Sequence, residues 1–134
     1  MNISTIREIL AEEGFRPDID EDGDITFKYQ GYSILIMPDE DDELYLRFVL
    51  PNFWPIESEA EREQAVETSV KVTRRVKAAK VFPVKDQMWA TVEIFLSSEK
   101  CLKDVLDRIL SVLHVSVETF AEEMRKFSKI EAEG

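Results

Sequence analysis

Four short stretches of strand-like sequence follow one another in the first half of the chain, and they constrain the fold more than any other feature. In the clearest stretch, residues 25–29, apolar Ile, Phe and Tyr alternate with Thr and Lys. A period of two residues is typical of a strand with one buried face. The other three stretches are residues 15–19, 32–37 and 44–50. Because turn residues separate them, the pattern predicts an antiparallel meander.

Helical patterns lie on both sides of this meander. Apolar residues recur at helical spacing from Ile3 to Leu10, and Gly14 follows as a helix C-cap. A second helix starts at Ser58, and Glu61 completes a capping box. Its acidic start and basic end match the helix dipole. The stripe that we expect it to bury consists of small side chains: Ala65, Val66, Ser69, Val70, Thr73 and Val76.

The second half of the chain predicts two further strands and a long helix. Residues 51–55, PNFWP, are interpreted as a stiff connector. Strand patterns then cover residues 81–84 and 88–96, and Pro83 places the first of them at a sheet edge or a bulge. The polar tail of the last helix is expected to fray. One apolar stripe marks this helix: Leu102, Leu106, Ile109, Leu113, Val117, Phe120, Met124 and Phe127.

These elements predict an α+β fold in the order α-ββββ-α-ββ-α, with a mainly antiparallel sheet of about six strands. A chain of 134 residues with 44% hydrophobic content suits one domain with an ordinary core. We therefore expect a single domain over residues 1–134, with an ordered core at about residues 3–127 and a polar C-terminal tail.

The charge of the chain is strongly negative and uneven. The net charge is −11; residues 1–69 hold 18 acidic and five basic side chains, and residues 70–134 hold 10 acidic and 12 basic ones. An acidic surface repels phosphate backbones, so no nucleic-acid partner is expected. The imbalance serves solubility, or it suits a basic partner or a self-association that brings unlike halves together.

The sequence also bounds the cellular location. No stretch approaches the ~20 apolar residues of a membrane span, so no membrane association is expected. The N-terminal sequence has no secretory signal pattern, and a single cysteine cannot form an internal disulfide. Both observations lead us to expect a cytoplasmic protein.

Side chains suited to catalysis are scarce, with one histidine, one cysteine and four glycines. His114 lies on the flank of the last helix, and Cys101 follows Lys100 at its start, so helical context explains both. Glu93 lies inside an apolar strand on the same side as Trp89, and three interpretations stay open: a solvent-facing residue, a residue paired with Arg or Lys, or a catalytic acid. We expect no enzyme, no catalytic residue and no cofactor.

One acidic turn looks like a calcium loop. Residues 18–25 match its first eight positions, with aspartates at positions 1, 3 and 5 and Gly23 at position 6. The twelfth position, which needs a bidentate glutamate, is Tyr29. The sequence therefore favours an acidic hairpin turn and no metal site. The second acidic run, residues 39–43, is interpreted as a solvated turn, and it would share a cation with the first only if the two hairpin ends lie side by side.

Three segments of the chain resemble the YbjN family of bacterial sensory transduction regulators. They are EEGFRPDIDEDGDITFKYQGYSILI, LYLRFVLPNFWPIES and MWATVEIF, the last leading into the long apolar helix. The fold of that family is similar to that of type III secretion chaperones. The resemblance implies a small α+β domain that often dimerises and binds protein segments, and it supplies no catalytic residues to carry over.

Aromatic residues are the best candidates for a binding surface. When helices cover one face of a sheet, alternation leaves some aromatic side chains on the other face, and an exposed aromatic patch marks a partner site. The candidate partner-binding residues are Tyr29, Tyr32, Trp54, Trp89 and Phe95.

A homodimer is also expected. Val105, Val112 and Val115 lie off the apolar stripe of the last helix, toward a second face that a monomer would make polar. These three valines are the candidate dimer interface, and closed two-fold pairing is the commonest arrangement.

The sequence thus predicts a non-enzymatic cytoplasmic protein-binding module of the chaperone or regulator type, which captures a segment of a partner protein. Such a segment can add main-chain hydrogen bonds at a sheet edge. The alternative is a small-molecule or metal-responsive regulatory domain, and a more distant one is an enzyme that uses carboxylates.

Overall fold

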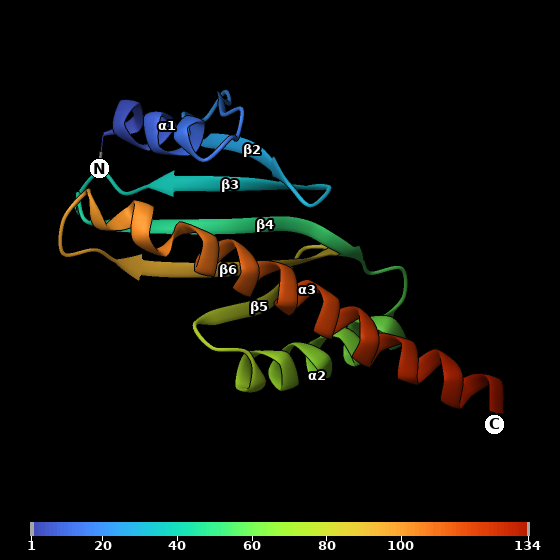
Figure 1. Cartoon of the computed structure of the whole chain (residues 1–134). Coiled ribbons are helices and arrows are strands. Elements are labelled where there is room, and N and C mark those ends of the chain that lie inside the picture. The colour runs from blue at the N-terminus through green and yellow to red at the C-terminus, as the bar shows by residue number, and fades with distance from the viewer. Residues whose placement is uncertain (1, 134) are drawn as a thin grey trace.

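The computed structural model describes residues 2–133 and shows one sheet with three helices (Figure 1). The order α-ββββ-α-ββ-α expected from the sequence is confirmed. The elements are α1 (Ile3–Glu12), β1 (Asp18–Ile19), β2 (Ile25–Tyr29), β3 (Tyr32–Pro38), β4 (Tyr45–Pro55), α2 (Glu59–Arg75), β5 (Ala79–Val84), β6 (Gln87–Phe95) and α3 (Cys101–Glu133).

All neighbouring strands are antiparallel, in the order β1-β2-β3-β4-β6-β5. Strands β1 to β4 form the expected meander. Strand β6 lies beside β4, and β5 is the outermost strand, as Pro83 indicated. The hairpin between β2 and β3 turns at Gln30 and Gly31, whose φ angles are 50° and 84°. Two consecutive positive φ angles define the type I′ turn that suits the strand twist.

The interpretation of residues 51–55 as a connector is wrong, because β4 continues through them to Pro55. A register shift separates Leu50 from Trp54 in the pairing with β6, and Asn52 within it has φ 53°. The Trp89 indole N–H donates to Asn52 Oδ1 at 3.0 Å across this irregularity. A bulge tolerates proline in a strand because some ladder hydrogen bonds are already missing there.

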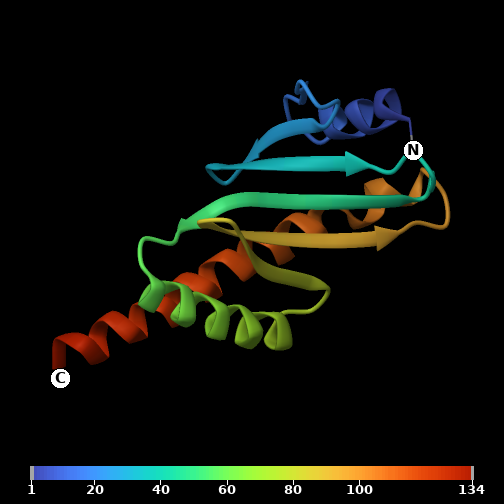
Figure 2. The same cartoon turned by 180° about the vertical axis from the view of Figure 1, so that it is seen from behind.

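The helices cover one face of the sheet. Helix α3 runs diagonally across it, α1 lies on the same side over β2 and β3, and α2 lies beside β5 and against α3 (Figure 1). Figure 2 shows the opposite face of the sheet, over which no helix passes. The largest fully buried side chains lie between the sheet and the helices: Phe48, Phe120, Ile6, Leu10, Ile25, Ile34, Ile36, Leu46, Leu50, Met88, Leu102 and Leu106.

Helix α2 begins as expected, and its buried stripe shares only Ala65 and Ser69 with the expected one. Ser58 is the N-cap, and its Oγ accepts from the Glu61 backbone N–H at 3.1 Å. Val66 and Val70, both expected to be buried, are 42% and 56% exposed. The helix instead packs through smaller side chains, some of them polar. The buried hydroxyl of Thr68 forms a hydrogen bond, because its Oγ1 donates to Met124 Sδ. The buried stripe is Ala65, Thr68, Ser69 and Val72.

Helix α3 continues to Glu133, beyond the residue at which the apolar stripe ends. Residues 128–133, where the polar sequence suggested fraying, are helical. No helix among residues 2–133 combines the length and the apolar composition of a bilayer-spanning segment.

Helix α2 closes the outer edge of the sheet. The Val81 backbone N–H on β5 points away from β6 and donates to Thr73 Oγ1 at 3.1 Å. Pro83 has no N–H to offer on the same edge. The opposite edge strand, β1, has only two residues. An extended partner therefore finds little free backbone at either edge.

Candidate binding surface

The face of the sheet over which no helix passes is here called the open face (Figure 2). The pairs Tyr45↔Phe95, Arg47↔Glu93 and Val49↔Thr91 lie opposite one another on β4 and β6. Because side chains alternate along a strand, this register fixes which residues share the face. By this register the open face includes Thr26, Lys28, Ser33, Leu35, Met37, Tyr45, Arg47, Val49, Lys80, Phe82, Trp89, Thr91, Glu93 and Phe95.

The centre of the open face is closely packed although no helix covers it. Val49 and Thr91 are 0% and 1% exposed, so the larger side chains around them shield them from water. Leu35, Phe82 and Trp89 are half-buried. A sheet face of this kind exposes the outer surfaces of large apolar side chains, which is typical of a surface that binds another protein.

An ion-pair network crosses the open face. Glu93 lies 3.4 Å from Arg47 Nε and 3.0 Å from Lys80 Nζ. The hydrogen bond from Lys80 is the main cause that lowers the pKa of Glu93; the positive charges of Lys80 and Arg47 act in the same direction, and partial burial opposes them. A carboxyl with a lowered pKa stays ionised at neutral pH and does not act as a proton donor. Of the three interpretations of Glu93, the structure supports the paired one.

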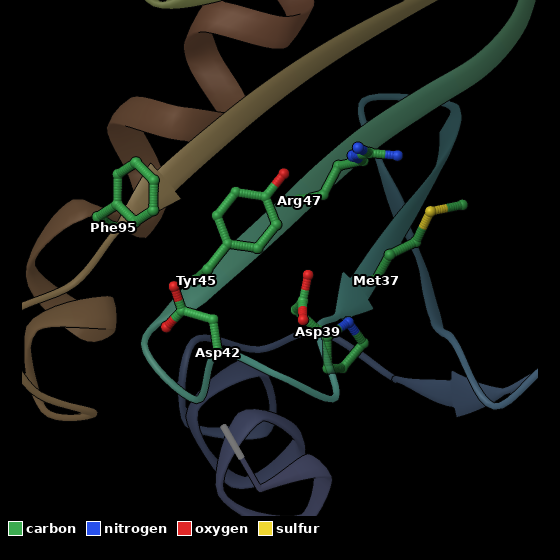
Figure 3. Close-up of a pocket in the computed structure, with 7 residues that line it drawn as sticks. Met37, Asp39, Asp42, Tyr45, Arg47 and Phe95 are labelled. Atoms are coloured by element: carbon green, nitrogen blue, oxygen red, sulfur yellow. The ribbon is translucent and has the colours of Figure 1, made fainter.

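A hollow of about 380 Å³ lies at the corner of the open face where β4 begins and β6 ends (Figure 3). We call it the corner hollow. The Tyr45 and Phe95 rings form one wall, with centroids 5.5 Å apart and planes tilted by 50°. The Leu96 N–H donates to the Leu44 carbonyl at 2.7 Å and fixes the two strand ends together. The hollow is lined by Met37, Pro38, Asp39, Asp42, Tyr45, Arg47 and Phe95.

The corner hollow is acidic and partly apolar. Asp39 Oδ1 accepts from the Asp41 N–H at 2.8 Å, and Asp42 Oδ1 accepts from the Leu44 N–H at 3.1 Å. Within residues 2–133, neither Asp39 nor Asp42 has a basic partner within 4.0 Å. The side chain of Arg47 points away from Asp42 (Figure 3). Phe95 is 77% exposed, an unusual state for a large apolar side chain.

The structure does not bring the five predicted partner-binding aromatics together. Tyr29 and Tyr32 lie on the helix side of the β2–β3 hairpin, where their rings are 6.2 and 5.9 Å from the His114 ring. Trp54 also lies on the helix side, with its ring 5.6 Å from that of Phe120. These three side chains contact this chain's own helix α3.

Only Trp89 and Phe95 of that set lie on the open face, six residues apart on β6. Sequence reasoning did not select Asp39, Asp42 and Tyr45, which share the corner hollow with Phe95. The acidic run next to Tyr45 can be recognised in the sequence as a candidate binding feature. That it lies close to Phe95 depends on the pairing of β4 with β6, which no local pattern specifies.

The three predicted dimer residues share a groove on the other side of the molecule. Val105 and Val112 are half-buried, and Val115 is 48% exposed. Val105 and Val112 line a depression of about 270 Å³ between α3 and the turn before β5, with Lys77 and Arg108 at its rim. A second depression of about 360 Å³ continues past Val112 and Val115. The groove thus has an apolar floor, and its charged lining residues are basic except for Glu93.

The acidic turn is a tight hairpin between β1 and β2. Asp20 Oδ1 accepts the backbone N–H groups of Asp22 and Asp24, both at 2.9 Å. The three carboxylates lie within 4.8 Å of one another. Burial, and then repulsion by the other two carboxylates, raise the pKa of Asp24. Tyr29, at the position of the missing calcium ligand, is half-buried against Phe15, with 6.3 Å between their ring centroids.

The lone histidine and cysteine lie apart from the open face. His114 Nε2 is 3.4 Å from Glu118 Oε1 one turn away on α3. Hydrogen bonds with Ser97 and Ser98 lower the pKa of the Cys101 thiol, whose sulfur is 3.0 and 3.3 Å from the two hydroxyls. Neither residue adjoins the corner hollow.

The element order, the antiparallel sheet and the helix-covered face define the fold class of the type III secretion chaperones. A family model described as "Putative bacterial sensory transduction regulator" matches residues 2–126. The chain belongs to this family, the YbjN family. Among curated proteins the sequence has no match.

Three solved structures share the fold at low sequence identity. YbjN from E. coli, described as a "putative transcription regulator", superposes with a TM-score of 0.71 at 12% identity, covering 92% of this chain and 94% of that one. An uncharacterized protein from Methanothermobacter thermautotrophicus gives 0.66 at 15% identity, covering 92% and 96%. The Yersinia pestis type III secretion chaperone SycH, solved in complex with a stable fragment of YscM2, gives 0.56 at 14% identity, covering 87% and 97%.

Proposed function

We propose that this protein is a non-enzymatic, cytoplasmic binding module of the chaperone or regulator type, which captures a segment of a partner protein on its open face. The observation that carries the proposal is the composition of that face. Aromatic side chains gather on it at Tyr45, Phe82, Trp89 and Phe95, no helix passes over it, and Phe95 is 77% exposed. An apolar face in a chain with a net charge of −11 is costly for solubility unless it has a partner.

The similarity of fold to SycH supports the proposal, because that protein was solved in complex with a protein fragment. The mode of capture differs from the strand addition expected from the sequence. The Thr73 hydroxyl accepts the Val81 N–H at the β5 edge, and β1 offers only two residues. Contacts with side chains of the open face therefore contribute most of the binding energy.

Homodimerisation through the groove beside α3 is the second part of the proposal. Val105, Val112 and Val115 give this groove an apolar floor, and it lies along helix α3 on the helix side of the sheet. A dimer formed there leaves the open faces of both copies free for partner segments.

Site-specific photo-crosslinking in the native host tests partner capture. A photoreactive phenylalanine analogue replaces Phe95 in one variant and Trp89 in a second. The matched control places it at Glu8, an exposed residue on α1. We expect one protein to be crosslinked from both open-face positions and not from the control, with adducts that map to one contiguous segment. Equal crosslinking from all three positions, or crosslinking to this chain alone, contradicts the proposal.

A synthetic peptide of the crosslinked segment then provides a direct measurement. We expect saturable binding in isothermal titration calorimetry, and a Kd at least about tenfold weaker for Trp89→Leu. The Val70→Ala variant is the control, since Val70 is an exposed apolar residue on α2, away from the open face. Equal loss of affinity in the two variants places the binding surface elsewhere.

A further inference from the structure

The corner hollow combines two chemical features. It has an aromatic wall, formed by half-buried Tyr45 and exposed Phe95, and a pair of carboxylates, Asp39 and Asp42, on the adjoining turn (Figure 3). We propose that this hollow binds the guanidinium of an arginine side chain in the captured segment. The inference rests on the proposed function, because the arginine belongs to the partner segment.

The two carboxylates are free to bind a cation. Each uses Oδ1 to accept a backbone N–H of its own turn, which fixes the carboxylate while leaving Oδ2 for a ligand. Arg47 also lines the hollow, but its Nε pairs with Glu93 and its side chain points away from Asp42. Residues 39–43 are all acidic, so the turn carries five negative charges next to the hollow. A cation that enters it gains attraction from several carboxylates at once.

The aromatic wall selects a flat cation. A guanidinium is planar, stacks on an aromatic ring and forms paired hydrogen bonds with carboxylates, whereas an ammonium group is compact and strongly hydrated. Phe95 presents most of its surface to solvent, so a stacked guanidinium and its methylene stem bury apolar area that is otherwise wet. Arginine therefore fits the corner hollow better than lysine.

The size and place of the hollow suit one side chain of a longer segment. Its volume of about 380 Å³ lies at the low end of the ~300–1,000 Å³ range of small-molecule pockets, and it opens widely to solvent. Its wall continues into the open face through Tyr45 and Arg47 on β4. A segment that lies across the open face can reach the hollow with a single residue. The five acidic residues of the turn at 39–43 draw a basic segment toward the hollow.

An NMR titration with small probes tests the site without a known partner. N-acetyl-argininamide is added to 15N-labelled protein, and N-acetyl-citrullinamide, which has the same shape without the charge, is the matched control. N-acetyl-lysinamide is the third probe. We expect saturable shifts of the Leu44, Tyr45 and Phe95 amides with the arginine probe, with affinity in the millimolar range because one side chain binds. The lysine probe should bind more weakly, and the citrulline probe should not saturate.

Two variants connect the binding to the named groups. Asp39→Asn with Asp42→Asn retains the oxygens that accept the turn N–H groups and removes both charges, so the turn should keep its structure. We expect at least about a fivefold loss of affinity for the arginine probe. Glu59→Gln with Glu63→Gln removes the same charge from exposed positions on α2 and should lose less than about twofold. Phe95→Leu, at an exposed position, should weaken binding of the arginine probe and leave its affinity close to that of the lysine probe.

The results separate this inference from the proposed function. If a partner segment is crosslinked at Phe95 but the arginine probe does not bind, or binds equally to the Asp39→Asn/Asp42→Asn variant, the arginine site is wrong and the binding module stands. If the arginine probe binds at the hollow but no segment is crosslinked from the open face, the corner hollow is an arginine site and the proposed capture of a segment is wrong. Equal binding of the arginine and citrulline probes also overturns the inference.

Discussion

Arg75 Nη1 lies 3.0 Å from Glu123 Oε1, and this ion pair joins helix α2 to helix α3. Lys126 Nζ donates to the same oxygen at 2.8 Å. The Glu123 residue is only 9% exposed. The hydrogen bond from Lys126 is the main cause that lowers the pKa of Glu123, with a further contribution from Arg75, and desolvation opposes both.

The lowered pKa of Glu123 gives the Glu123→Gln variant a defined pH dependence. The folded-state pKa lies below the ordinary value of 4.5, so the ionised carboxylate stabilises the fold above that value. This contribution is lost as the pH falls through the folded-state pKa. We expect Glu123→Gln to lower the free energy of unfolding at about pH 7, and the difference from the native chain to shrink toward about pH 3. Urea unfolding at both pH values measures it, with exposed Glu122→Gln as the control; a difference independent of pH contradicts the ion-pair explanation.

Phe120 holds the bulged end of β4 against α3. Its side chain is fully buried, and its ring contacts those of Phe53 and Trp54 at 5.2 and 5.6 Å. We expect Phe120→Ala to lower the free energy of unfolding by about 3–5 kcal/mol, because a large cavity forms in the core. Phe127→Ala, at a half-buried position on the same helix, should cost less. Chemical unfolding followed by tryptophan fluorescence compares them, and equal losses would refute the central place given to Phe120.

The acidic turn should not bind calcium at physiological concentrations. Asp20, Asp22 and Asp24 lie close together, but the half-buried Tyr29 stands where a calcium loop needs a bidentate carboxylate. Calorimetric titration with calcium should give no saturable heat. A Kd tighter than about 10 µM, in the range of calcium sensors, would show that the turn completes its coordination in another way.

His114 and Cys101 should be dispensable for binding. His114 contacts Tyr29 and Tyr32, and Cys101 contacts two serines at the start of α3, so neither faces the open face. The double variant His114→Gln with Cys101→Ser should fold and should capture the crosslinked segment with unchanged affinity. Circular dichroism checks the fold, and loss of capture in a folded variant would reveal a functional role for one of the two residues.

Light scattering coupled to size exclusion tests the expected dimer. At micromolar concentrations we expect a mass of twice the 15.6 kDa of one chain. Val112→Glu with Val115→Glu places two charges in the apolar groove and should yield monomers that retain the native circular dichroism spectrum. Val70→Glu on α2 is the control, since Val70 is 56% exposed outside the groove. A mass of one chain throughout the concentration range rules out the dimer.

Local patterns in the sequence predicted the order of elements well. The alternation in residues 25–29, the Ser58 cap and the apolar stripe of α3 each specify one element through its own period. Proline at position 83 correctly placed β5 at an edge. Prolines 51 and 55 led to the wrong prediction of a connector at residues 51–55. The bulge in β4 accommodates prolines that a regular strand excludes.

The sites depend on relationships that no local pattern contains. Alternation shows which residues share a face of the sheet, but not which face the helices cover. The sequence therefore could not show that Tyr29, Tyr32 and Trp54 lie on the helix side. It also could not show that Trp89 and Phe95 lie on the open face. The stripe of α2 was found only in part from the sequence: Ala65 and Ser69 were expected, but Thr68, whose hydroxyl donates to Met124 Sδ, and Val72 were not. The corner hollow needs the Tyr45↔Phe95 register, which joins segments 50 residues apart.

The hydrogen bond between Val81 and Thr73 affects how readily this chain aggregates at high protein concentration. Sheets coalesce into fibrils when edge strands of separate molecules form continuous ladders of backbone hydrogen bonds. In this protein the Thr73 side chain of α2 accepts a backbone N–H of edge strand β5, and Pro83 in the same strand has no N–H. The other edge strand, β1, is two residues long. The molecule can thus display an apolar sheet surface at high concentration without offering its neighbours a template for fibril growth.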